Sequence, residues 1–161
     1  MSKSLNKLPD IIVHAIYSND IETIRNWQSK EVINHYDKDK RTPIFHAILA
    51  VSKEAIVQLS TDNPDLNGHD SKGWYPLHYA VQQYLVEIAA LLIKAGADLE
   101  VKDTYGNTPL WRATFSSNGK GDMIKLLLAN GADANNENSS GINPLKLANT
   151  IANYNITQYY K

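Results

Sequence analysis

Apolar residues recur along this chain in short stretches that are separated by turn-forming residues. Between residues 87 and 95, the side chains of Ile88, Leu91 and Leu92 are spaced so that they share one face of an α-helix. Met123, Leu126 and Leu127 repeat this spacing further along. A second helix is predicted in front of each, opened by a proline in its first turn. The four predicted helices are 76–83, 87–95, 109–116 and 122–130.

A six-residue signature spans the start of the first helix of each pair and recurs at an almost constant interval. Its four occurrences are Thr42-Pro43-Ile44-Phe45-His46-Ala47, Tyr75-Pro76-Leu77-His78-Tyr79-Ala80, Thr108-Pro109-Leu110-Trp111-Arg112-Ala113 and Asn143-Pro144-Leu145-Lys146-Leu147-Ala148. The prolines are 33, 33 and 35 residues apart. A constant period of this length indicates stacked supersecondary units, not a single closed core.

Other positions share the same register. One series is Asp37, Asp70, Asp103 and Asn138; a second, three residues later, is Lys40, Gly73, Gly106 and Gly141; a third is Asn34, Asn67, Glu100 and Asn135. The three glycines suit a turn that needs a positive φ, so Lys40 predicts a somewhat different first turn. Gly96 and Gly131 are predicted to end the second helices of their units.

The period and the Thr-Pro-Leu-His-x-Ala signature resemble the ankyrin repeat. The resemblance implies an all-α repeat solenoid, in which helix-turn-helix units stack and β-hairpin turns join them. We expect about five units within a single domain at residues 8–161, with modified caps at both ends. The expected units are 8–37, 38–70, 71–103, 104–138 and 139–161, and residues 1–7 are expected to be disordered.

The two ends depart from the repeat, as terminal units of such arrays do. The N-terminal unit lacks the signature, but its register predicts helices at about 9–17 and 20–28. In the last unit, Tyr159 and Tyr160 take the positions of Leu91 and Leu92, which suits a half-buried terminal helix. The two extra residues of the third interval are placed in a flexible loop at 115–121.

Composition and charge limit the classes of partner. The formal net charge is −1, which argues against nucleic acid and anionic membranes as partners. The charge is uneven, because residues 1–53 carry 8 Lys and Arg against 6 Asp and Glu, whereas residues 54–161 carry 8 against 11. This polarity is mild, but it is able to orient a partner. There are no cysteines and no long apolar segment, so a cytoplasmic protein is expected.

The residue types and their spacing give little support for catalysis or for metal binding. The five histidines are scattered over three units without metal-ligand spacing, and His78 is the histidine of the signature itself. The chain has no cysteine nucleophile, no Gly-x-Ser-x-Gly elbow and no phosphate-binding glycine loop. We therefore expect no enzyme activity, no cofactor and no metal.

The resemblance implies binding through hairpin tips and the exposed parts of the first helices, along a concave face. The candidate partner-binding residues are Lys38, Asp39, Arg41, Lys72, Trp74, Gln82, Gln83, Tyr105, Asn107 and Phe115. Trp74, Tyr105 and Arg41 belong to the residue types that dominate binding hot spots. The alternative for Trp74 is that it folds down onto Tyr75 or a neighbouring hairpin. For Tyr75 and Trp111, packing between repeats is the favoured interpretation.

The functional expectation is a protein-interaction module that is monomeric when free and occupies a specific protein partner. Inhibition or neutralisation of that partner, which would be a toxin or an enzyme, is the favoured form, and a bacterial immunity protein is its specific version. Two alternatives stay open. One is a scaffold, adaptor or chaperone-like factor that supports a partner enzyme, and the other is a delivered effector that mimics host ankyrin proteins.

Overall fold

The computed structural model describes residues 7–28 and 33–161 of the chain. Within these residues, helices in tandem pairs account for the regular structure. The first helices of the pairs are α1 (Asp10–Tyr17), α3 (Pro43–Leu49), α5 (Pro76–Gln82), α7 (Pro109–Phe115) and α9 (Pro144–Thr150). The second helices are α2 (Ile21–Gln28), α4 (Lys53–Leu59), α6 (Val86–Lys94) and α8 (Asp122–Ala129), and 3-10 turns lie at Ser60–Asp62 (η1) and Ile156–Tyr160 (η2).

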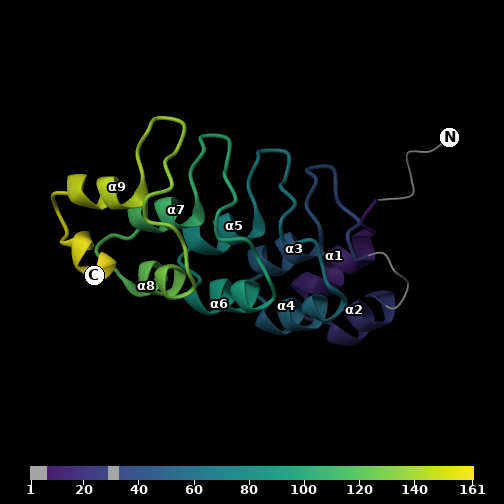
Figure 1. The fold of residues 1–161 in the computed structure, drawn as a ribbon. Helices are drawn as coiled ribbons and strands as arrows, with labels where there is room; N and C mark the ends of the chain where they lie inside the picture. Colours follow the sequence, from purple (N-terminus) through teal and green to yellow (C-terminus); the bar gives the residue numbers. More distant parts are fainter. Residues whose placement is uncertain (1–6, 29–32) are drawn as a thin grey trace.

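The pairs stack side by side into an elongated all-α solenoid of about five units (Figure 1). The first helices form one row, the second helices form a row beneath them, and the hairpin loops project from the opposite side of the first row. We call the surface formed by the hairpin tips and the exposed sides of the first helices the hairpin face.

One apolar core runs through the stack, because no single pair of short helices can bury its own apolar face. Ile56, Ile88 and Leu92 are completely buried in the second row, and Ile48 and Leu110 are buried in the first. The sequence periodicity is confirmed, and the predicted helix boundaries differ from the observed ones by one residue at most. The expected disordered segment 1–7 lies outside the described residues, except for Lys7, which pairs with Tyr36.

The last unit ends in the 3-10 turn η2 and not in a full second helix. Its tyrosines pack against the loop with the two extra residues. The hydroxyl of Tyr159 donates to the carbonyl oxygen of Gly119 at 2.8 Å, and the hydroxyls of Tyr160 and Thr114 are hydrogen-bonded. Burial raises the pKa of Tyr160 to about 12. The C-terminal cap is therefore joined to the preceding unit through polar contacts as well as apolar ones.

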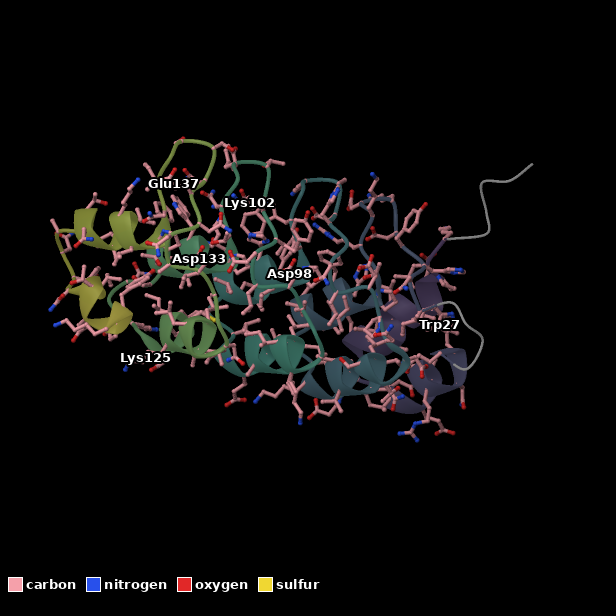
Figure 2. The ribbon with its side chains drawn as sticks, in the orientation of Figure 1. Trp27, Asp98, Lys102, Lys125, Asp133 and Glu137 are labelled. Carbon is pink, nitrogen blue, oxygen red and sulfur yellow. The ribbon has the colours of Figure 1, made fainter. Side chains whose placement is uncertain are left out.

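The polar series that starts at Asn34 links successive units below the hairpins. The side-chain oxygens of Asn34, Asn67 and Glu100 each accept a hydrogen bond from a backbone N–H one unit further on, at 2.8–2.9 Å. The donors in the last two cases are Asp98 and Asp133, which lie on the segments that lead from the second helices toward the hairpins (Figure 2). The carboxylates of Asp98 and Asp133 each accept a hydrogen bond from the backbone N–H two residues further along. These bonds fix a turn in each segment.

All four hairpins share one turn geometry, which corrects the expectation for Lys40. Its φ of 59° is close to those of Gly73, Gly106 and Gly141, which lie between 72° and 76°. A left-handed conformation costs a residue with a Cβ about 1–2 kcal/mol. The first hairpin therefore keeps the common turn in spite of its lysine.

Replacing Lys40 by glycine is expected to stabilise the protein. We expect the free energy of unfolding to rise by about 0.5–1 kcal/mol, because relief of the left-handed strain exceeds the added entropy of the unfolded chain. Urea denaturation measures this change. As the matched control, Gly106→Ala is expected to destabilise, since its new Cβ would lie 2.7 Å from the backbone nitrogen of Ser139. An unchanged or lower stability of Lys40→Gly would contradict the strain argument.

Candidate protein-binding face

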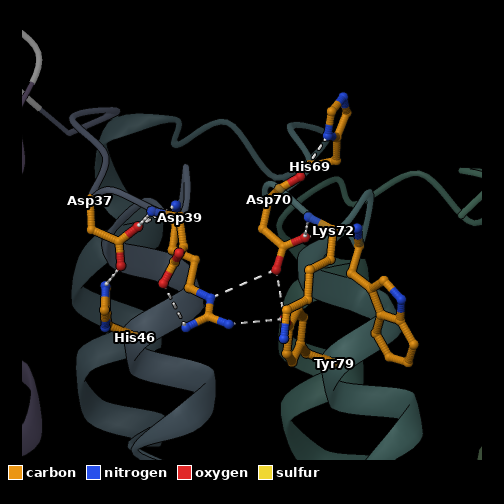
Figure 3. Close-up of polar contacts among 9 residues, drawn as sticks. Asp37, Asp39, His46, His69, Asp70, Lys72 and Tyr79 are labelled. Atoms are coloured by element: carbon orange, nitrogen blue, oxygen red, sulfur yellow. Dashed lines mark hydrogen bonds and ion pairs between the residues drawn. The ribbon is translucent and has the colours of Figure 1, made fainter. Parts of the chain in front are cut away.

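Each hairpin begins with a residue of the Asp37 series, which holds it. The four hairpins start at Asp37, Asp70, Asp103 and Asn138, and each hairpin and the unit that it opens are numbered in this order. In the second unit, Oδ1 of Asp70 accepts hydrogen bonds from the backbone N–H groups of Lys72 and Trp74 at 2.9 and 3.0 Å (Figure 3). Asp37, Asp103 and Asn138 make the same two bonds in their own hairpins, to the second and fourth residues that follow. A single oxygen thus fixes the tip, so the side chains of the tip itself are not needed for its shape.

The second oxygen of each aspartate reaches a side chain nine residues later, on the first helix of the same unit. Oδ2 of Asp37 lies 3.1 Å from Nε2 of His46, and Oδ2 of Asp70 accepts from the hydroxyl of Tyr79 at 2.6 Å. Oδ2 of Asp103 accepts from Nε of Arg112 at 2.7 Å and also from its Nη2. The fourth unit differs, because Nδ2 of Asn138 donates to Oδ1 of Asn107 at 2.8 Å.

Burial and hydrogen bonding act in opposite directions on the carboxyls of Asp70 and Asp103. Burial raises the pKa of each, but hydrogen bonds from a side chain and from two backbone N–H groups outweigh it. The side-chain donors are Tyr79 for Asp70 and Arg112 for Asp103. The pKa of both carboxyls is therefore lower than usual, and both are charged at neutral pH.

Arginine and aromatic side chains form a continuous row across the hairpin face. The guanidinium carbon of Arg112 lies 4.8 Å from the ring centroid of Trp74 and 5.9 Å from those of Tyr105 and Trp111. Trp111 stacks on Phe115 with centroids 5.4 Å apart. The row continues to the first hairpin through the contact of Trp74 with Tyr79 and that of Tyr79 with Arg41. We call Arg41, Trp74, Tyr79, Tyr105, Trp111, Arg112 and Phe115 the aromatic row.

A surface hollow of about 420 Å³ lies at one end of the aromatic row, between the third and fourth hairpins. Apolar parts of its wall come from Tyr105, Trp111, Phe115 and Ile142. Tyr105 and Phe115 are 66% and 61% exposed, although nothing in the hairpin turn or in the core requires them. The indole N–H of Trp111 is buried without a hydrogen-bond partner among the described residues.

The structure places the sequence candidates in three groups. Exposed side chains of the hairpin face are Lys38, Lys72, Gln82, Gln83, Tyr105 and Phe115; partly buried ones are Asp39, Arg41 and Trp74; Asn107 is buried. Asn107 is only 4% exposed, and its amide bonds Asp103 and Asn138, so its side chain serves the hairpins, and contact of Asn107 with a partner stays a prediction.

Trp74 does not stand free at its hairpin tip. Its ring packs on Tyr79 and His78 and beneath the guanidinium of Arg112, so it supports the row as well as belonging to it. Sequence reasoning missed Arg112, which joins the second and third hairpins. The signal that identifies it is its spacing of nine residues from Asp103, the same as that of His46 from Asp37.

A family model for ankyrin repeats matches the chain in three overlapping copies, at residues 11–103, 48–138 and 85–159. The chain belongs to the ankyrin-repeat family. Ankyrin repeats mediate protein–protein interaction, and the family is a non-catalytic interaction module. In the described part of this ankyrin-repeat chain, no group of histidine and acidic side chains is arranged to hold a metal ion. Its described helices are too short or too polar to cross a membrane.

Three curated relatives with different names are similar to parts of this chain. A "Putative ankyrin repeat protein" of Rickettsia bellii is 31% identical over 123 residues, which cover 74% of this ankyrin-repeat chain and 67% of the relative. "NF-kappa-B inhibitor alpha" of Gallus gallus is 46% identical over 67 residues, 42% of this chain and 21% of the relative. "Probable 26S proteasome regulatory subunit p28" of Saccharomyces cerevisiae is 32% identical over 117 residues, which cover 70% of this chain and 50% of the relative. The chain thus spans only a fifth and a half of the last two relatives.

His78 links two neighbouring ankyrin repeats from a fully buried position. Its Nε2 lies 2.9 Å from the carbonyl oxygen of Asn107 in the next hairpin. Burial lowers the pKa of His78 to about 4, although the Asn107 carbonyl and the Asp103 carboxylate favour the charged ring. The pKa of His46 is lowered too, again by burial, against the influence of Asp37. Both rings are therefore neutral in the folded protein at neutral pH.

Mild acid is expected to destabilise the fold through His78. Because the unfolded ring takes up a proton near pH 6.5 and the folded ring only near pH 4, stability is lost as pH falls between these values. The free energy of unfolding should fall by about 2 kcal/mol between pH 7 and pH 5. Urea denaturation at both values measures this loss. His78→Gln, whose amide can still donate to Asn107, should lose clearly less; an equal loss in the variant would refute the assignment to His78.

Removing the partner of a buried carboxylate is expected to cost more than replacing it by another donor. Arg112→Leu leaves the buried Asp103 carboxylate without its charged donor, and we expect a loss of about 3 kcal/mol in the free energy of unfolding. Arg112→Tyr copies the Asp70–Tyr79 pair of the second unit and should lose less. Thermal and urea unfolding of both variants test this order, and equal losses would show that the hydrogen bond to Asp103 is not what Arg112 contributes.

Proposed function

We propose that this ankyrin-repeat protein acts without catalysis, by binding one protein partner across the hairpin face and blocking the partner's activity. The observation that carries the proposal is the aromatic row with its open hollow. Arginine, tryptophan and tyrosine are the side chains that contribute most to protein interfaces. Here they form one surface over three hairpins, and the turns themselves are fixed by the Asp37 series.

The combination of exposure with a place beside the hollow selects the residues that we assign to a partner. Tyr105 and Phe115 are large apolar side chains left in water beside a hollow, which is costly for a protein that is monomeric when free. Arg41 and Arg112 are pre-positioned by the buried carboxylates of Asp70 and Asp103. A pre-positioned surface loses less conformational entropy on binding, which favours tight association.

Inhibition is favoured over support of a partner by one comparison. The chicken relative is named as an inhibitor, and its matching segment is the most similar of the three in identity. A bacterial immunity protein that neutralises a toxin is the specific version of this proposal. It is tested by expressing the captured partner with and without this chain: a toxin should arrest growth only when expressed alone.

Two exposed side chains provide the main test of the binding face. Tyr105→Ala/Phe115→Ala is expected to weaken binding of the captured partner at least tenfold, with little change in melting temperature, because both side chains lie mostly in water. Affinity capture with mass spectrometry finds the partner, and calorimetry measures the dissociation constant and a one-to-one stoichiometry.

The matched control for this test is Val57→Ala on the second-helix row. Val57 is 54% exposed and apolar but does not belong to the hairpin face, so its removal should leave binding unchanged. Loss of binding in this control, with retention in the double variant, would move the interface to the second helices. A partner that binds but keeps or gains activity would favour the scaffold alternative.

A further inference from the structure

We infer that the partner segment bound by the hairpin face is an acidic peptide stretch with one large apolar side chain. Its carboxylates lie over the first two hairpin tips, and its apolar side chain enters the hollow between the third and fourth. This inference rests on the proposed function and adds the chemistry and the direction of the bound segment.

The first two hairpin tips carry cationic side chains that the protein does not neutralise. Lys38, Lys40 and Lys72 are exposed, and no ion pair involves them among the described residues. The acidic groups nearby are engaged elsewhere. Asp39 lies 3.8 Å from Arg41, the Asp37 carboxylate faces His46, and Asp70 is buried against Tyr79 and Arg41. Three ammonium groups thus stand outside the ion pairs of the described residues, and the four cations of these two hairpins exceed their three aspartates by one charge.

The conformation of Lys40 is a second, independent observation. The equivalent positions of the other three hairpins are glycines, and Lys40 adopts the same left-handed backbone with a φ of 59°. A strained residue that persists in place of the unstrained choice points to a role for its side chain. The hairpin turn needs no ammonium group, so the role lies outside the fold.

The tips of the third and fourth hairpins carry no charged side chain, and the nearest lysines are engaged, because Lys102 donates to the carbonyl oxygen of Glu137 and Lys146 pairs with the Glu137 carboxylate. The tips of the third and fourth hairpins carry Thr104, Tyr105, Ser139 and Ser140. The only charged side chain that lines the hollow is Arg112, and the buried Asp103 carboxylate already holds it. A large apolar side chain can therefore enter beside Tyr105 and Phe115 without leaving a charge unpaired.

The spacing of the repeats fixes the length of the bound segment. Neighbouring tips are in direct contact, since backbone hydrogen bonds join Ser71 to Asp39 and Ser139 to Tyr105 at 2.8 and 3.1 Å. Packed helices lie about 8–10 Å apart, so the first tip and the hollow are separated by about 20–25 Å. An extended chain advances about 3.3 Å per residue. About six to eight residues then separate a carboxylate over the first tip from the apolar side chain.

A protein segment fits this surface better than single-stranded nucleic acid, which also uses cations and aromatic rings. Trp111 and Phe115 stack on each other, and Trp74 lies beneath Arg112, so these ring faces are already occupied. The net charge of −1 also disfavours a long polyanion. An acidic peptide places only a few charges over the lysines.

The experiment selects phage-displayed random 12-residue peptides on the full-length protein. The selected peptides are expected to combine Asp or Glu with a Phe, Trp, Leu or Met six to eight residues away. The affinity of the best peptide is then measured by fluorescence anisotropy at 50 and 300 mM NaCl. Lys38→Glu/Lys40→Glu/Lys72→Glu should weaken it at least tenfold, and so should the higher salt concentration.

The controls separate this inference from the proposed function. Lys94→Glu/Lys125→Glu/Lys161→Glu makes the same change in net charge away from the hairpin tips and should alter the affinity less than twofold. Peptides that lose affinity in Tyr105→Ala/Phe115→Ala but show no acidic preference, and bind the Lys38/Lys40/Lys72 variant normally, overturn the inference and leave the proposed function standing.

Two further outcomes are decisive. If no selected peptide depends on Tyr105 and Phe115, the hairpin face is not the docking surface, and the proposed function fails together with the inference. If a 12-nucleotide oligothymidine binds as tightly as the best peptide and competes with it, the surface recognises nucleic acid and the acidic-peptide assignment is wrong.

Discussion

The structure depends on one side-chain oxygen at the start of each hairpin. Oδ1 of the Asp37-series residue accepts two backbone N–H groups and so replaces the contacts that the tip side chains would otherwise supply. Asn138 shows that an amide oxygen is sufficient for this task. The aspartates offer a second oxygen, and it anchors a side chain of the following helix. One residue type thereby shapes the turn and also positions the cations and aromatics of the hairpin face.

The interfaces between successive units are chemically different, although the units share a backbone plan. The histidine of the repeated signature bridges to the next hairpin only at His78, because Phe45 has no donor and the Trp111 indole N–H finds no acceptor. The third and fourth units are joined instead by the amides of Asn107 and Asn138. These substitutions remove one uniform hydrogen bond, but they supply large rings to the proposed binding surface.

The sequence could predict the repeat and its helices because both depend on periodic positions. The apolar side chains of Ile88 and Leu92, for example, identify the face of their helix that packs into the core. The contacts that individual tip side chains make were harder to predict. Trp74 lies under Arg112, from the next unit, and this contact depends on how two hairpins pack rather than on any local pattern. Lys40 was misjudged because the shared hydrogen-bond frame imposes the left-handed turn against the preference of the residue. The pairing of Asp103 with Arg112 was readable, since it recurs at a fixed spacing of nine residues.

Because the hydrogen bonds of the Asp37 series fix each turn, the tip residues outside the left-handed position vary with little effect on the fold. They vary in an ordered way along the array. Cations lie on the first two tips, and uncharged and apolar side chains surround the hollow between the last two. A surface with such a gradient distinguishes the two directions in which a segment can lie, because reversal would place carboxylates in the apolar hollow and leave the lysines without partners. Electrostatic attraction of this kind contributes more to orientation and association rate than to affinity, and the affinity then comes from the buried apolar contact. The division of the hairpin face therefore favours a partner that is recognised in one orientation.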